Sequence, residues 1–393
     1  MVNCRARRGT RFSIAHPLSS AVSARFPTSD FRLPTSEPMT SIWQDFQGHD
    51  AQIAMFRRAI GRGRLGQSYL FVGPSGIGKR TFARKLATCL FCKEHAETEL
   101  EACGECPACR QMAASSYPDY YEVGLPEGKN EIPLELMIGK RDERGRAGLC
   151  HDIAMTPMAG SRRIGVINDA PRLNEEGVNS FLKTLEEPPA GALLILIAEQ
   201  PGDVLPTIRS RCQIVSFQPL SEAVIAELLL AQGLTEDPSA ARSIAMLSEG
   251  SLAMARRLVT PELQELRQAA REVFERRPFS AAEAGATLSK LIESAGDTIA
   301  QREATIWLAR FLATFFRQVN RSLLLEDASD PQSRAFGERL VRAAGDETEA
   351  VERLGALTAR VGDLGWQVGL YVQPRVCVET LFYDLGNCLR GEA

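Results

Sequence analysis

The sequence lacks any uninterrupted apolar run of the roughly 18 residues that a membrane-spanning helix requires. Its longest such run, residues 192–198, has the length of a buried strand. The chain also lacks a strong net charge: a formal value of −3 excludes a generally basic protein that coats nucleic acid, so any DNA contact must be local. With 44% hydrophobic residues over 393 positions, we expect a soluble globular protein of two or three domains and no membrane association.

Cysteines are too few and too unevenly spaced for the disulfide framework of a secreted protein. There are 10 in the chain, and five of them crowd between positions 89 and 109. This distribution favours the reducing cytoplasm as the location of the protein.

The first 38 residues have few acidic side chains, with Asp30 and Glu37 against six arginines, and show no helical stripe. We therefore expect residues 1–38 to form a disordered, dispensable tail. An organelle transit peptide has a similar composition, and a start codon assigned too early is a third interpretation, with Met39 as the first residue.

Residues 69–81, Y-L-F-V-G-P-S-G-I-G-K-R-T, have the layout of a phosphate-binding loop between an apolar strand and a helix. Glycines allow successive backbone N–H groups to turn toward an anion, and Lys79 supplies a positive charge. The candidate nucleotide-binding residues are Gly73, Gly76, Gly78, Lys79 and Thr81. Arg80 stands where a hydrolase needs the hydroxyl that holds magnesium, and Thr81 follows one position too late. The alternative is a glycine turn that only joins strand to helix.

A second position that binds magnesium in nucleotide hydrolases also differs in this sequence. Residues 163–168, R-I-G-V-I-N, read as a buried strand followed by Asp169. A nucleotide hydrolase places its magnesium-binding aspartate at the end of such a strand, and Asn168 stands there instead. A neutral amide holds a divalent cation less well than a carboxylate does, so together with Arg80 it argues against turnover.

Four cysteines form the pattern C-x10-C-x2-C-x2-C, in which Gly104 and Pro107 suit a tight knuckle. The candidate metal ligands are Cys92, Cys103, Cys106 and Cys109, in a module at about residues 89–112. Four thiolates satisfy a closed tetrahedral zinc site, and no histidine is interleaved, so we expect the zinc to be structural. Reduced surface thiols are the alternative, and Cys89 could replace Cys92 as the first ligand.

Helices and strands alternate through this half of the chain, which predicts a parallel sheet covered on both faces. We expect helices around residues 53–60, 82–90 and 178–185, and further strands at 192–198 and 214–217. Residues 118–160 read as polar and irregular, with a solvated charged patch at 140–146.

The C-terminal part reads as helical. Ser221 is a candidate N-cap, residues 260 and 261 mark a boundary, and an apolar stripe over residues 306–323 has helical spacing and indicates core.

The phosphate loop, the four-cysteine insert, N-S-F-L-K-T-L-E-E-P-P and I-R-S-R-C-Q, in this order, resemble the bacterial DNA polymerase III clamp-loader ATPase-like subunits. The resemblance is strong over about residues 42–219. It implies an α/β P-loop (AAA+) domain over 39–219 with the zinc insert, a small helical lid over 220–260 and an all-α collar domain for oligomerisation over 261–393.

Within that family, the sequence is more similar to the delta-prime subunit than to the ATP-hydrolysing tau/gamma subunit. Arg80 and Asn168 favour this reading. So does Ala198, where the ATPases carry a polar residue that senses the γ-phosphate. In the lid, Ala253 replaces the sensing arginine, and Arg256, a turn away, is a poor substitute.

The S-R-C triplet at residues 210–212 is intact. In the family its arginine, here Arg211, reaches into the ATP site of a neighbouring subunit, so the resemblance implies a chain that has lost its own catalytic parts but keeps the one that acts in trans. A surface salt bridge is the alternative role for Arg211. The implied partners are the tau/gamma and delta subunits in a hetero-oligomeric ring, primed DNA and, indirectly, the sliding clamp, with nucleotide binding possible and hydrolysis not expected. A working tau/gamma-type ATPase and a small-molecule kinase with a zinc lid remain as alternatives.

Overall fold

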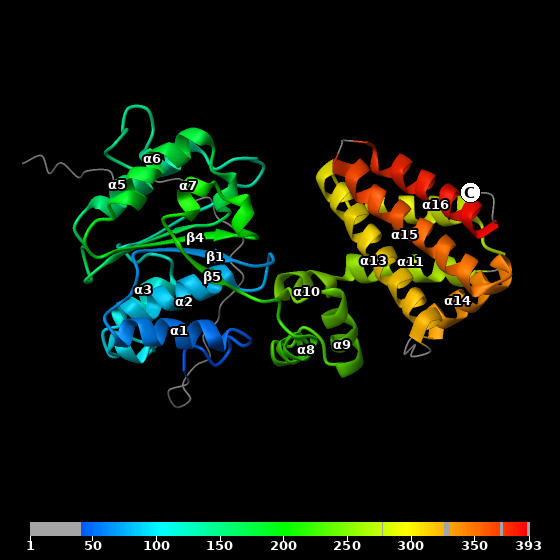
Figure 1. The fold of residues 1–393 in the computed structure, drawn as a ribbon, viewed down its shortest axis with the longest axis horizontal. Coiled ribbons are helices and arrows are strands. Elements are labelled where there is room, and N and C mark those ends of the chain that lie inside the picture. Colours follow the sequence, from blue (N-terminus) through cyan, green and yellow to red (C-terminus); the bar gives the residue numbers. More distant parts are fainter. Residues whose placement is uncertain (1–40, 277, 326–330, 370–371, 391–393) are drawn as a thin grey trace, which may run out of the picture.

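The computed structural model describes residues 41–276, 278–325, 331–369 and 372–390. The expectations for the tail at 1–38 and for Met39 lie outside these residues. The described part forms an α/β domain at one end and a helical region at the other (Figure 1).

Five strands form one parallel sheet in the order β2-β3-β4-β1-β5. They are β1 (Ser68–Val72), β2 (Tyr120–Val123), β3 (Arg163–Ile167), β4 (Ala192–Ala198) and β5 (Gln213–Ser216). Because all strands run the same way, their carboxyl ends meet at one edge of the sheet. The phosphate loop follows β1 at that edge, and Asn168 follows β3 there.

Both faces of the sheet are buried, which explains why its central strands are continuous apolar runs. Alternate residues of β1 point to opposite faces: Tyr69 and Phe71 belong to one buried cluster, Leu70 and Val72 to another. Helices α1, α2 and α3 cover one face, and α5, α6 and α7 the other (Figure 1). The helices of this domain are α1 (Asp50–Gly61), α2 (Lys79–Phe91), α3 (Pro107–Ala113), α4 (Leu134–Ile138), α5 (Leu149–Ala154), α6 (Glu175–Glu186) and α7 (Pro206–Arg209).

The interpretation of residues 118–160 as irregular is wrong in part, although the charged patch at 140–146 is exposed and lies outside the helices and strands, as expected. They contain the edge strand β2 and the helices α4 and α5. β2 has four residues, pairs with β3 alone and includes the charged Glu122, so it shows no apolar run. The two helices have five and six residues, too few for a periodic pattern to be recognised.

The rest of the described chain is helical. The first three helices are α8 (Glu222–Ala231), α9 (Pro238–Leu247) and α10 (Leu252–Leu258). They are followed by α11 (Pro261–Glu275), α12 (Ala281–Ser294), α13 (Thr298–Leu325), α14 (Pro331–Ala344), α15 (Glu347–Gly369) and α16 (Pro374–Arg390). The predicted fold class, a parallel α/β domain with a four-cysteine insert followed by an all-helical C-terminal region, is confirmed.

Two local predictions in the helical region can be compared with the structure. Ser221 caps α8 as expected, since its Oγ accepts a hydrogen bond from the N–H of Val224 at 3.3 Å. The stripe over residues 306–323 is mostly core, but Ile306 is 39% exposed. No helix of the described part is long and apolar enough to cross a membrane.

Candidate functional site

The loop between β1 and α2 adopts a conformation that only glycine tolerates at three positions. Gly73, Gly76 and Gly78 have φ values of 149°, 72° and 103°. A Cβ on Gly73 would lie 2.3 Å from the carbonyl oxygen of Phe217. The predicted glycine positions are therefore each required by the backbone, and the loop can turn N–H groups toward an anion.

Lys79 is buried at the first position of α2 and is held by the loop itself. Its Nζ donates to the carbonyl oxygens of Gly73 at 2.5 Å and Pro74 at 2.6 Å. Burial lowers the pKa of Lys79, and the nearby carboxylates of Glu199 and Asp169 oppose that shift. The lysine is placed at the loop as predicted, with its charge directed at backbone carbonyls.

The two altered metal positions are joined by one carboxylate. The guanidinium of Arg80 pairs with Oε1 of Glu122, and Asn168 Nδ2 donates to the same oxygen at 2.7 Å. The hydroxyl of Tyr120 donates to the other oxygen at 2.9 Å. Glu122 has a side chain only 13% exposed, and it therefore connects α2, β2 and the end of β3. A divalent cation here would have to displace the Arg80 guanidinium, so these residues do not fit a magnesium site. Thr81 is exposed and takes no part in this cluster.

The first turn of α10 packs directly on the loop. The N–H of Ala253 donates to the carbonyl oxygen of Gly76 at 3.2 Å, and a Cβ on Gly76 would lie 2.3 Å from Ser251 Oγ. Arg256 is bonded instead to Gln232, with its Nη2 donating to Oε1 at 2.9 Å. The small side chain of Ala253 thus allows α10 to pack closely on the loop, and Arg256 is held by the residue that follows α8.

Arg211 lies on the surface just after α7. Its side chain is 35% exposed, and Nη2 donates to Glu186 Oε1 at 2.6 Å. Nη1 donates to the backbone oxygen of Thr207 at 2.7 Å. The surface salt bridge considered as the alternative role is present in the structure, and the guanidinium remains accessible to another molecule.

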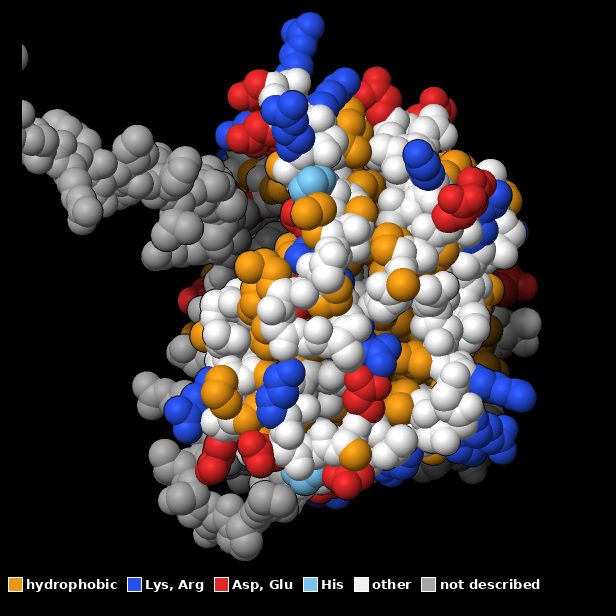
Figure 2. Space-filling view, turned by 90° about the vertical axis from the view of Figure 1, so that its left-hand side faces the viewer, with side chains coloured by type: hydrophobic (Ala, Val, Ile, Leu, Met, Phe, Trp, Pro, Cys, Tyr) orange, Lys and Arg blue, Asp and Glu red, His pale blue; other side chains and the backbone are white. Residues whose placement is uncertain are grey.

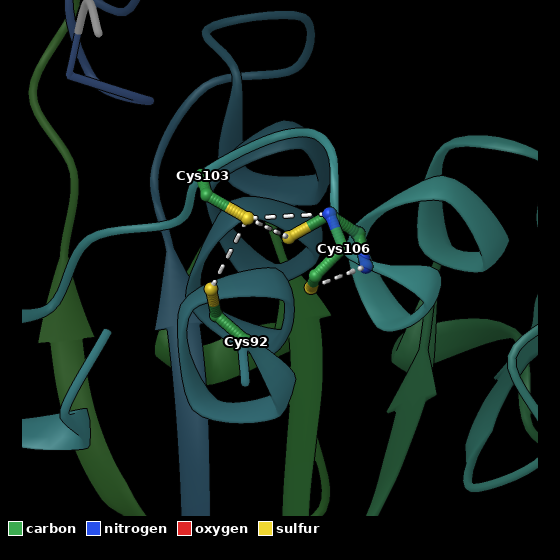
Figure 3. Close-up of side chains that lie close together, drawn as sticks. Cys92, Cys103 and Cys106 are labelled. Atoms are coloured by element: carbon green, nitrogen blue, oxygen red, sulfur yellow. Dashed lines mark hydrogen bonds between the residues drawn. The ribbon is translucent and has the colours of Figure 1, made fainter. Parts of the chain in front are cut away.

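The four predicted metal ligands come together. Their sulfur atoms all lie within 4.8 Å of one another, with Cys92 and Cys103 separated by 3.8 Å and Cys103 and Cys109 by 3.9 Å (Figure 3). A tetrahedral zinc with Zn–S bonds of about 2.3 Å has S–S edges of about 3.8 Å. The thiols therefore fit a structural metal such as zinc, which would link the end of α2 to the start of α3 and supply no chemistry.

The knuckle forms as the sequence indicated. Gly104 has a φ of 75°, Pro107 begins α3, and the N–H groups of Cys106 and Cys109 point at the sulfur atoms of Cys103 at 3.3 Å and Cys106 at 3.5 Å. Cys89 is fully buried and does not belong to the group of four sulfur atoms, so Cys92 is the first ligand of the cluster.

Two residues of this site were missed from the sequence. Glu122 lies in the stretch that was read as irregular, and no motif points to it. His49 is 1% exposed behind the loop, with Nε2 at 2.8 Å from the carbonyl oxygen of Ile77. Its position just before α1, following Gly48, was the only signal.

Charge on the end of the α/β domain is mixed. In Figure 2, basic and acidic side chains are interspersed over the face shown and neither sign forms a continuous surface. This agrees with the small net charge of the chain.

A family model described as DNA polymerase III, delta subunit, matches residues 48–221. DNA polymerase III subunit delta' of Pseudomonas aeruginosa is 35% identical over 55% of this chain and 62% of its own length. The Bacillus subtilis subunit delta' is 33% identical over 48% of this chain and 53% of its own, and the tau subunit of the same organism is 29% identical over 53% and 36%. The matches thus span less than two thirds of these relatives' length.

Proposed function

Because the chain belongs, through residues 48–221, to the delta-prime family of DNA polymerase III clamp-loader subunits, we propose that it acts in DNA replication as a largely non-hydrolysing organiser of the clamp loader. It assembles with tau/gamma and delta subunits into a hetero-oligomeric ring in the cytoplasm. This ring opens sliding clamps and closes them on primed DNA. The relation to both delta' and tau proteins supports this choice of partners.

The observation that carries the non-hydrolysing role is the contact of Glu122 with both Arg80 and Asn168. Hydrolysis needs a magnesium ion that bridges the β- and γ-phosphates, and the protein normally supplies a hydroxyl and a carboxylate for it. Here a guanidinium and an amide stand at those positions and share one carboxylate. The positive charge at these positions is therefore supplied by the chain itself, through the guanidinium of Arg80.

The loop itself retains the geometry for phosphate. Nucleotide bound there would contact the N–H groups of Gly76 and Gly78 and the Nζ of Lys79, and this requires Lys79 to leave the carbonyls of Gly73 and Pro74. The hydrogen bond from Ala253 to Gly76 must break as well, so that the first turn of α10 can move away from the nucleotide. Nucleotide binding without turnover is therefore compatible with the structure. We expect this binding to be weak, because these hydrogen bonds must break first.

Arg211 is the residue that acts on a neighbour. Its accessible guanidinium presents a fixed planar fork of donors, which suits the charge that develops on a γ-phosphate during transfer. An arginine supplied in trans accelerates comparable nucleotide hydrolases by about 10³ to 10⁵. The chain thus contributes to hydrolysis only at the site of the adjacent ATPase subunit.

The test is ATP hydrolysis by the purified chain alone with Mg²⁺. We expect no steady turnover, whereas a rate near that of a competent clamp loader would establish the tau/gamma-type alternative and refute the proposal. A phosphoryl-transfer screen that finds an acceptor would favour the kinase alternative, for which the contact of Arg211 with Glu186 has no use.

A further inference from the structure

Two motifs that stand apart in the sequence meet in the structure. L-E-E-P-P occupies residues 185–189 at the end of α6, and S-R-C occupies residues 210–212 after α7. The contact between them is the 2.6 Å hydrogen bond from Arg211 Nη2 to Glu186 Oε1.

The carboxylate of Glu186 does not stabilise its own helix. It is the last residue of α6, where the partial negative charge of the helix end disfavours a carboxylate. Pro188 stops the helix two residues later, and buried Leu185 anchors the turn that carries Glu186. The carboxylate is therefore held at a defined point in front of α7.

The contact adds little to stability, because the two side chains are 35% and 49% exposed and solvent screens such a pair. The contact instead fixes the direction of the Arg211 guanidinium. Thr207 O holds Nη1 and Glu186 holds Nη2, so the plane of the guanidinium is fixed at two points, while Nε makes no hydrogen bond with a described residue.

We propose that Glu186 is the positioning residue of Arg211: it holds Nη2 and so keeps the direction of the guanidinium while the remaining N–H donors meet a neighbouring triphosphate. This inference rests on the proposed function of Arg211. A guanidinium has five N–H donors, and Nε makes no hydrogen bond with a described residue, so donors stay available to the phosphate while the direction is kept, and a charge held in the reactive geometry raises the rate of the chemical step.

The experiment uses a reconstituted clamp loader in which the subunit adjacent to this chain carries the sole hydrolysing site. Glu186→Ala is expected to lower kcat about tenfold with KM for ATP unchanged, because misdirection of a charge in the transition state costs rate more than binding. Glu187→Ala is the matched control: this neighbouring glutamate is exposed and makes no side-chain hydrogen bond with a described residue, so kcat should not change.

Two further variants separate positioning from a structural role. Glu186→Gln keeps an acceptor oxygen and should retain most of the rate, so a loss as large as that of Glu186→Ala would contradict the positioning role. Glu186→Ala combined with Arg211→Ala should be no slower than Arg211→Ala alone. If Arg211→Ala slows hydrolysis and Glu186→Ala leaves kcat unchanged or higher, this inference alone is overturned. If Arg211→Ala itself has no effect, the proposed function fails and the inference with it.

Discussion

Replacing Glu122 by alanine should destabilise the isolated chain by about 2–4 kcal/mol. The variant removes the acceptor of Asn168 Nδ2 and of the Tyr120 hydroxyl, at 2.7 and 2.9 Å. A hydrogen bond to a charged group contributes about 1.5–3 kcal/mol, and the partial exposure of the donors favours the lower figure for each bond. Arg80 adds less than about 1 kcal/mol, because its side chain is 47% exposed.

Urea unfolding of the wild type and of Glu122→Ala, followed by circular dichroism, measures the difference in the free energy of unfolding. Glu122→Gln is the matched control and should lose less than half as much, since its amide keeps an acceptor and gains a donor. A double-mutant cycle with Arg80→Ala isolates the ion pair and should give a coupling below about 1 kcal/mol. If Glu122→Ala unfolds at the same urea concentration as the wild type, Glu122 does not connect the two altered metal positions and the reasoning is refuted.

Three further outcomes are expected. Gly76→Ala should destabilise the chain by about 1–3 kcal/mol in the same urea assay, because the new Cβ meets Ser251 Oγ at 2.3 Å and φ is +72°; an unchanged midpoint would contradict the contact of α10 with the loop. Metal analysis should find one zinc per chain, and Cys106→Ser should release it and lower Tm, whereas a metal content equal to that of the wild type would contradict the tetrahedral cluster. Burial lowers the pKa of His49 below its ordinary value of 6.5, so its contribution to stability is complete above that pH and is lost as the pH falls through the folded-state pKa; His49→Gln should therefore flatten the decline in stability below pH 6.5, and an unaltered pH profile would contradict the buried neutral ring.

Long apolar runs and glycine spacing made much of the fold predictable. The strand at residues 192–198 is apolar throughout because helices cover both faces of the sheet, and its observed bounds match the prediction. The cysteine cluster was equally predictable from the sequence, since Cys103, Cys106 and Cys109 lie on one short knuckle and only Cys92 comes from the end of α2.

Contacts between residues far apart in sequence were not predictable in this way. The pairing of Arg80 with Glu122 joins a helix to an edge strand 42 residues later, and β2 gave no pattern of its own because it is short and half-buried. The contact of Arg211 with Glu186 depends on where α6 ends relative to α7, which neither motif encodes alone. The sequence therefore pointed to positions 80 and 168, and the structure shows the carboxylate of Glu122 that joins them.

The central claim is that this chain has lost its own magnesium site and still acts on its neighbour through Arg211. The most direct measurement is the single-turnover rate of ATP hydrolysis at the adjacent site of the reconstituted complex, with wild-type chain, with Arg211→Ala and with Arg62→Ala, an exposed arginine of the same domain, as the control. We predict a loss of about 10³ or more for Arg211→Ala and none for the control. Equal rates for wild type and Arg211→Ala would contradict the account.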